Sequence, residues 1–276
     1  MTAIKHRNKW RYAKMSSYVE NLYHYPIKGL TAQPLQKVAL TKGQGFPLDR
    51  AFGFARPESG FDPNDPKPLP KTKFVMLARE EGLALLDTHF DEVTETLSIR
   101  RDRNKASFDL ASSSGREAAS SFLADLLGFP PDLQPTLYSA EPHKFTDVSV
   151  VSPEMMNSVS LINLNSVTHF SQVIGQSVDP ARFRGNIHFS GFPPFSELDL
   201  VGQHIALGEI EMKVVLRTKR CPATQVNLQS GKRDLDIPKL LQKHLGHSNM
   251  GIYAEVLSSG NLKLGDQVRL IQLGCG

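Results

Sequence analysis

Apolar and polar side chains alternate cleanly along residues 210–216. A period of two residues is typical of a strand with one buried face, so this stretch predicts a half-buried strand. Residues 217–220 then bring three cations, and Cys221 follows them directly. Pro222 has no N–H to donate to a sheet, so regular pairing is expected to break there. The pattern therefore predicts a cysteine at a strand end, surrounded by positive charge.

A cysteine in such surroundings is expected to have a lowered pKa and to be partly thiolate at neutral pH. Thiolates bind soft metals or attack electrophiles, and any of the nine histidines could pair with Cys221 in space. A buried, inert cysteine beside a solvated basic turn explains the local pattern equally well. The pattern around Cys221 leaves both interpretations open.

The rest of the hydrophobic pattern indicates a mainly β chain with few helices. Short strand signals separated by turn residues fill the N-terminal part, which is typical of a small barrel or a curled sheet. Apolar residues three and four positions apart predict the helices. The expected strands are 18–25, 35–41, 48–55, 74–77, 83–86, 96–100, 106–110, 159–164, 187–189, 204–207, 223–228, 251–257 and 267–273, and the expected helices are 115–127, 165–174 and 236–245.

These elements suggest three segments. Residues 1–16 are basic and contain few apolar side chains, so we expect a disordered tail there. We expect an all-β, barrel-like N-terminal domain over residues 17–112 and a second domain over residues 113–276. The proline-rich stretch 57–73 predicts an exposed loop or flap.

Composition narrows the class of protein. A chain of 276 residues with 40% hydrophobic residues can bury a core without disulfides. Its two cysteines, Cys221 and Cys275, make a disulfide framework improbable and favour a reducing compartment, so a cytoplasmic protein is expected. The net charge of +4 suits anionic ligands. We expect no nucleic-acid partner and no membrane partner, because neither an aromatic-interleaved basic stripe nor a long apolar run occurs.

A second set of anion-binding groups lies outside the cysteine motif. Arg182, Arg184 and Asn186 gather at the start of a predicted strand and offer two guanidinium forks and an amide. Arg50 is predicted to lie within the strand 48–55, on the same face as Leu48, Phe52 and Phe54, so it is expected either at the end of the strand or with its guanidinium pointing into a site. Taken alone, residues 182–186 are explained equally well by a solvated loop. Arg50, taken alone, is explained equally well by an arginine at the rim of the strand that bonds Asp49 or a loop carbonyl.

Taken together, five motifs resemble the molybdenum cofactor sulfurase C-terminal (MOSC) family with its N-terminal MOSC β-barrel domain. They are Tyr25-Pro26-Ile27-Lys28, Asp49-Arg50, Phe183-Arg184-Gly185-Asn186-Ile187, Arg220-Cys221 and Gly260-Asn261-Leu262-Lys263-Leu264-Gly265-Asp266. They occur in the family's order and cover the chain from about Ser17 to Leu273. In the order of its motifs and domains, the chain is most similar to the amidoxime-reducing MOSC proteins.

The resemblance implies a molybdenum ion held by a pterin dithiolene, with Cys221 as the protein ligand and the catalytic residue. For the second domain, residues 113–276, it implies a β-barrel with a few peripheral helices. It implies activity independent of pyridoxal phosphate. By position in the motifs, the residues implied to hold the cofactor are Lys28, Arg50, Asn165, Ser166, Arg184, Asn186, Lys219, Arg220 and Tyr253. The loop 148–158 is longer than usual in the family and blurs the match at Asn165 and Ser166.

Some residues depart from the family pattern. Gly29 stands where the family often has serine, and Lys219 stands where a small hydroxyl residue is common. The cysteines of a fused iron–sulfur domain are missing, as is a membrane anchor, so electrons are expected from a separate flavin, haem or iron–sulfur protein.

The resemblance therefore implies an oxidoreductase that reduces small N-oxygenated substrates. Such a substrate is expected to enter between the two domains, with residues 192–195 or the proline-rich loop as a wall. The alternatives are a non-redox carrier of the cofactor or of persulfide sulfur on Cys221, and a metal-free module that binds another phosphate ligand.

Overall fold

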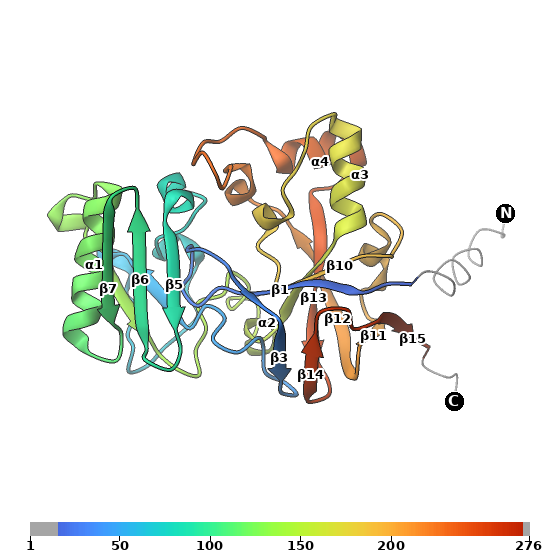
Figure 1. Ribbon diagram of the computed structural model, residues 1–276, viewed down its shortest axis with the longest axis horizontal. Coiled ribbons are helices and arrows are strands. Elements are labelled where there is room, and N and C mark those ends of the chain that lie inside the picture. Colours follow the sequence, from blue (N-terminus) through green and yellow to red (C-terminus); the bar gives the residue numbers. More distant parts are fainter. Residues whose placement is uncertain (1–15, 273–276) are drawn as a thin grey trace.

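The computed structural model describes residues 16–272, so the predictions for the basic tail and Cys275 fall on residues outside the described part. The chain is mainly β, with 33% of residues in strands and 26% in helices, which confirms the predicted class. Figure 1 shows two lobes side by side, with strand β1 running from one lobe toward the other. Among the described residues, no helix combines the length and hydrophobicity needed to span a bilayer.

The larger lobe is built on an eight-stranded sheet. Its strand order is β15 (Val268–Ile271), β11 (His204–Leu207), β12 (Ile210–Lys219), β13 (Asn249–Val256), β9 (Val159–Asn163), β10 (Ile187–Phe189), β1 (Val19–His24) and β2 (Gln33–Leu35). Strands β9 and β10 are parallel, and the other neighbours are antiparallel. Strand β3 (Lys37–Leu40) pairs with β14 (Gly260–Lys263). The first strands of the chain therefore belong to the sheet formed mostly by its second half.

The smaller lobe contains a three-stranded antiparallel sheet and a two-stranded one. The first consists of β5 (Asp87–Asp91), β6 (Thr96–Arg101) and β7 (Asn104–Asp109), and the second of β4 (Phe52–Ala55) and β8 (Thr136–Ser139). Helix α1 (Ser113–Leu127) packs against β7 and β8 (Figure 1). It buries Leu123 and Ala119 in the core of this lobe. Our boundary at residue 112 stays a prediction.

Three further α-helices lie in the second half: α2 (Pro153–Met156), α3 (Leu164–Ile174) and α4 (Ile237–Leu245). Helix α1 begins after Ser112, whose side chain accepts a hydrogen bond from the N–H of Gly115, and Gly128 ends it in a left-handed conformation. Asn163 caps α3 and Asp236 caps α4 in the same way. Side-chain acceptors satisfy the free N–H groups of a first helical turn, which is why these positions set the starts.

Several strand predictions are wrong. Residues 81–85 form a 3₁₀ turn, η3 (Glu81–Leu85), because Leu83 and Leu86 are three apart and a 3₁₀ helix brings such residues onto one face. Pro222 begins another, η7 (Pro222–Gln225), in place of the strand predicted at 223–228. The remaining 3₁₀ segments are η1 (Pro57–Ser59), η2 (Lys71–Lys73), η4 (Pro131–Leu133), η5 (Pro180–Phe183) and η6 (Ser196–Leu200). Strands β5, β8 and β14 were not predicted, and the strand predicted at 74–77 is only an isolated bridge at Phe74.

Candidate functional site

Cys221 lies at the end of the longest strand. Strand β12 continues to Lys219, further than the alternation predicted, because β13 stays paired with it as far as Asn249. The register shifts twice, and the second shift lies between Arg217 and Lys219. Bulges of this kind re-aim side chains, so consecutive residues no longer alternate between faces. Cys221 follows as the half-buried residue before η7.

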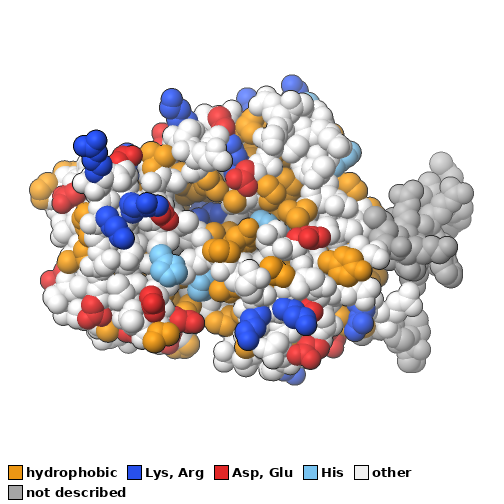
Figure 2. Space-filling model, viewed as in Figure 1, with side chains coloured by type: hydrophobic (Ala, Val, Ile, Leu, Met, Phe, Trp, Pro, Cys, Tyr) orange, Lys and Arg blue, Asp and Glu red, His pale blue; other side chains and the backbone are white. Residues whose placement is uncertain are grey.

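The cysteine opens into a pocket of about 410 Å³ between the two lobes. Figure 2 shows hydrophobic and basic side chains together along the hollow seam between the lobes. Eight of the predicted site residues line this pocket: Lys28, Arg50, Arg184, Asn186, Lys219, Arg220, Cys221 and Tyr253. The structure thus brings together groups that are up to 225 residues apart in the chain, counted from Lys28 to Tyr253.

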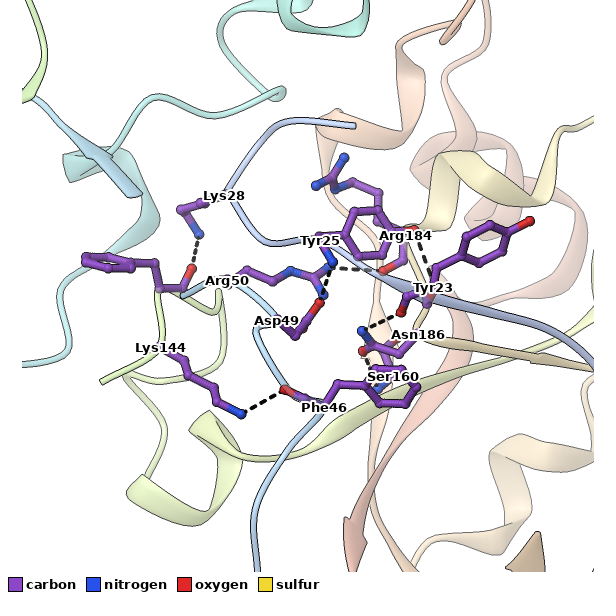
Figure 3. Close-up of polar contacts among 12 residues, drawn as sticks. Tyr23, Tyr25, Lys28, Phe46, Asp49, Arg50, Lys144, Ser160, Arg184 and Asn186 are labelled. Carbon is purple, nitrogen blue, oxygen red and sulfur yellow. Dashed lines mark hydrogen bonds and ion pairs between the residues drawn. The ribbon is translucent and has the colours of Figure 1, made fainter. Parts of the chain in front are cut away.

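Tyr25 holds two of the arginines in place (Figure 3). The guanidinium carbon of Arg50 lies 4.2 Å from the centre of the Tyr25 ring, and that of Arg184 lies 4.3 Å from it. The two cations come from opposite halves of the chain, and Arg50 Nη2 also donates to the backbone oxygen of Arg184 at 3.1 Å. Burial raises the pKa of Tyr25 to about 12, although both neighbouring cations act to lower it. The tyrosine therefore stays neutral and offers its ring face to both cations.

Both arginines sit in strained backbone. Arg50 has φ of 54° and Arg184 has φ of 51°, in the left-handed region that side chains other than glycine rarely occupy. The strand predicted from residue 48 is wrong for this reason: the turn of residues 48–50 breaks it, and β4 begins only at Phe52. Gly185 follows Arg184, and a Cβ there would lie 2.4 Å from a side-chain carbon of Ile162. Such strain gathers at functional sites, where the fold fixes a side chain in one direction.

Arg184 and Arg220 are held by backbone carbonyl groups. Arg184 Nη1 donates to the oxygen of Leu30 at 2.8 Å. Arg220 Nε donates to the oxygen of Met250 at 2.7 Å, and its Nη1 to that of Phe183 at 2.8 Å. Burial lowers the pKa of each guanidinium to about 10, so both remain charged at neutral pH. Neutral carbonyls leave the positive charge uncompensated, which favours an anionic ligand.

A carboxylate pairs with two lysines of the pocket. Asp147 forms ion pairs with Lys28 and with Lys71, whose Nζ lies 3.2 Å from Oδ2. Lys71 and Cys221 line the same pocket, and the cysteine is one of the groups that raise the pKa of Lys71. Burial opposes ionisation of Asp147, but Lys28 and Lys71 outweigh it and hold its pKa well below the usual range. Lys71 belongs to η2 at the end of the proline-rich stretch, so this loop reaches the pocket.

Asn186 lines the pocket, but its amide is already engaged. Its Oδ1 accepts a hydrogen bond from the N–H of Ser160 at 3.2 Å, and its Nδ2 donates to the oxygen of Tyr23 at 3.2 Å. These contacts tie β10 to both of its neighbours in the sheet, β9 and β1 (Figure 3). Asn186 thus supports the pocket wall.

Asn165 and Ser166 do not line this pocket, so the structure does not bring them together with the other residues implied to hold the cofactor. They are in the first turn of α3, where Asn165 Nδ2 donates to the oxygen of Phe192 at 3.0 Å and Ser166 Oγ to Glu197 at 2.8 Å. Burial raises the pKa of Glu197 to about 7. The segment 192–195 is held by these contacts and does not line the pocket, whereas Lys71 of the proline-rich stretch does. Of the two predicted walls, only the loop is found there.

The residues of the pocket fit an anionic pterin cofactor. Arg184 Nη2, Thr146 Oγ1 and Thr218 Oγ1 are buried and find no hydrogen-bond partner among residues 16–272. All three residues line the pocket. Buried polar atoms are normally satisfied, so three unpartnered ones around one cavity point to polar groups of a ligand. The surrounding cations and the Cys221 sulfur match a phosphate and a soft metal, respectively.

Sequence reasoning missed several lining residues: Lys71, Asp147, Thr146, Ser160 and Thr218. Asp147 and Thr146 follow Phe145, but nothing in this local pattern distinguishes them from other polar residues beside an apolar one. No feature of the sequence marks Lys71 as a site residue, because its position near Cys221 depends on how the loop folds back.

Comparison with known proteins gives two family matches. Residues 143–269 match the model of the MOSC domain, and residues 16–129 match that of the MOSC N-terminal beta barrel domain. No match is found among the curated proteins. The MOSC domain is associated in general with the molybdenum cofactor.

Among solved structures, the chain is similar to YuaD of Bacillus subtilis, with 16% identity, a TM-score of 0.44, and coverage of 92% of this chain and 94% of that one. It is 20% identical to YiiM of Geobacillus stearothermophilus, with a TM-score of 0.34 and coverage of 43% and 56%. It is 18% identical to YiiM of Escherichia coli, with a TM-score of 0.32 and coverage of 42% of this chain and 55% of that one. The chain thus spans little more than half the length of the YiiM proteins. Because the two family models together extend from residue 16 to residue 269, this protein belongs to the MOSC family and carries the family's N-terminal β-barrel domain.

Proposed function

We propose that this protein is a molybdenum-cofactor oxidoreductase that reduces N-oxygenated substrates with electrons from a separate protein. The observation that supports it is the pocket itself, which is lined by one half-buried thiol, by eight arginine and lysine side chains and by three residues with unpartnered buried polar atoms. When bound, the cofactor supplies two-electron chemistry that removes oxygen from an N–O group. The overall reaction consumes two electrons and two protons and releases water with the amine.

The chain's own residues divide the work of holding the cofactor. The Cys221 sulfur is the protein ligand of the metal. Arg184 and Arg50, which stack on the Tyr25 ring, would bind the phosphate of the cofactor, and Arg220 lies next to Cys221 in the chain. Lys71 lines the same pocket and is held by Asp147, so it brings a fixed positive charge to the side of the cavity that holds the thiol. Prior fixation of such contacts lowers the cost of binding.

The test uses protein produced in a host that makes the cofactor. Purified wild type is given N-octylhydroxylamine and a chemically reduced viologen dye, which replaces the unknown electron donor, and octylamine is measured. We expect turnover in wild type and in the matched control Cys275→Ser, and none in Cys221→Ser.

Other outcomes would refute the proposal. Molybdenum and pterin bound without octylamine formation would favour a carrier of the cofactor. A persulfide found on Cys221 would favour a carrier of sulfur. Wild type that retains no molybdenum but binds another phosphate ligand would favour the metal-free module.

A further inference from the structure

A second cavity of about 520 Å³ adjoins the first. Three residues line both cavities: Gly29, Leu77 and Arg184. The wall between them is therefore thin, and its one charged group is the Arg184 side chain, whose Nη2 has no partner among the described residues.

The walls of this second cavity are mostly aliphatic. Six leucines line it, namely Leu30, Leu77, Leu83, Leu85, Leu86 and Leu228. The hydroxyl of Thr31, another lining residue, is already satisfied, because Oγ1 donates to the oxygen of Leu86 at 2.6 Å. A ligand here would therefore meet leucine side chains over much of its surface.

The outer end of the cavity is framed by both lobes. Leu85 is 37% exposed and packs against Gly231, where an added Cβ would lie 2.9 Å from the leucine side chain. Arg233 ties the two segments together, since its Nε lies 2.7 Å from Glu81 and its Nη2 donates to the oxygen of Ala78 at 2.9 Å. These contacts hold the two segments in fixed positions at the outer end of the cavity.

Two exposed carboxylates, Asp87 and Asp102, also line this cavity. Asp87 is paired with Arg100, whereas no partner of Asp102 is found within residues 16–272. An anionic group at the outer end of a ligand would be repelled there. The charge pattern favours a ligand whose outer end is apolar or cationic.

The volumes of the two cavities suggest a different ligand for each. Drug-sized ligands occupy pockets of roughly 300–1,000 Å³. A pterin with its dithiolene and phosphate is such a ligand, and the first pocket, at about 410 Å³, lies near the lower end of this range, so a bound cofactor would occupy it. The body of a substrate then needs space outside that pocket, and the adjoining cavity offers it.

We propose that the second cavity binds the apolar body of the substrate, so that the protein acts on N-hydroxylated compounds with an alkyl or aryl chain and no distal anionic group. This inference rests on the proposed function for the identity of the head group. The N-hydroxyl end passes Gly29 and Leu77 toward the first pocket, and the chain lies among the leucines.

Binding to metal-free protein tests the cavity without any turnover. The probes are N-alkylhydroxylamines from methyl to octyl, titrated calorimetrically. Each added methylene is expected to raise affinity about fourfold until the cavity is full. Ala84→Trp and Ala32→Trp place an indole in the cavity from two different segments, and Ala111→Trp adds one at an exposed position of the same lobe.

We expect both cavity variants to weaken octylhydroxylamine binding at least tenfold, with methylhydroxylamine binding unchanged and Ala111→Trp without effect. Thermal unfolding verifies that each variant is folded. An affinity that does not depend on chain length, or octyl binding unchanged in both cavity variants, would overturn the inference.

Loaded enzyme separates this inference from the proposed function. Chain-length-dependent binding without turnover would sustain the cavity and refute the reductase. Turnover whose KM is the same for methyl and octyl substrates would refute the cavity and sustain the reductase.

Discussion

Replacing Tyr25 with leucine removes the ring that fixes two cations of the pocket. Each guanidinium lies little more than 4 Å from the ring centre in a desolvated setting. Cation–π contacts contribute about 0.5–2 kcal/mol each, so losing both should cost about 1–4 kcal/mol beyond the loss of packing. Phe170→Leu measures that packing cost alone, because Phe170 is fully buried and no cation–π contact to it is found in residues 16–272.

The assay is urea unfolding of the metal-free variants at pH 7. Tyr25→Phe keeps the ring and loses only a long hydrogen bond, 3.4 Å from the hydroxyl to the oxygen of Gly185, so it should cost less than about 1 kcal/mol. Tyr25→Leu should also retain less molybdenum than Tyr25→Phe, because Arg50 and Arg184 lose their common support. Equal stabilities of Tyr25→Leu and Phe170→Leu would refute the reasoning.

Three other changes test separate parts of the structure. Glu197 keeps its proton to about pH 7 when folded, against a usual value of 4.5, so the folded state binds more protons between these values and stability should fall as pH rises from 4.5 to 7. Glu197→Gln should remove that slope in pH-dependent urea unfolding, and an unchanged slope would exclude Glu197 as its cause. Gly29 has φ of 86°, so Gly29→Ala should lower the free energy of unfolding by about 1–2 kcal/mol, and a variant as stable as wild type would show that the left-handed turn carries no strain. Lys71→Met should lower molybdenum content more than Lys73→Met, because Lys71 lines the pocket while Lys73 Nζ bonds the oxygen of Glu58 outside it; equal content would remove Lys71 from the site.

Features set by neighbours in the chain could be predicted from the sequence. Cys221 and Arg220 are adjacent, and Arg184 and Asn186 are two apart, so their motifs place them without knowledge of the fold. Helix α1 follows from its apolar spacing and from Gly128 at its end.

Features that depend on tertiary contacts could not be predicted. The pairing of β3 with β14 joins segments more than 200 residues apart, as the partners Leu40 and Gly260 show. The position of Lys71 beside Cys221 depends on the same kind of contact. Alternation also misplaced Arg50, because the left-handed turn that carries it leaves no trace in the hydrophobic pattern.

The most direct test of the central claim is the molybdenum and pterin content of protein purified from a cofactor-producing host. We expect close to one molybdenum and one pterin per chain in wild type and in Cys275→Ser, and loss of the metal in Cys221→Ser. Wild type without molybdenum, or Cys221→Ser with as much as wild type, would contradict the assignment of Cys221 as the metal's ligand.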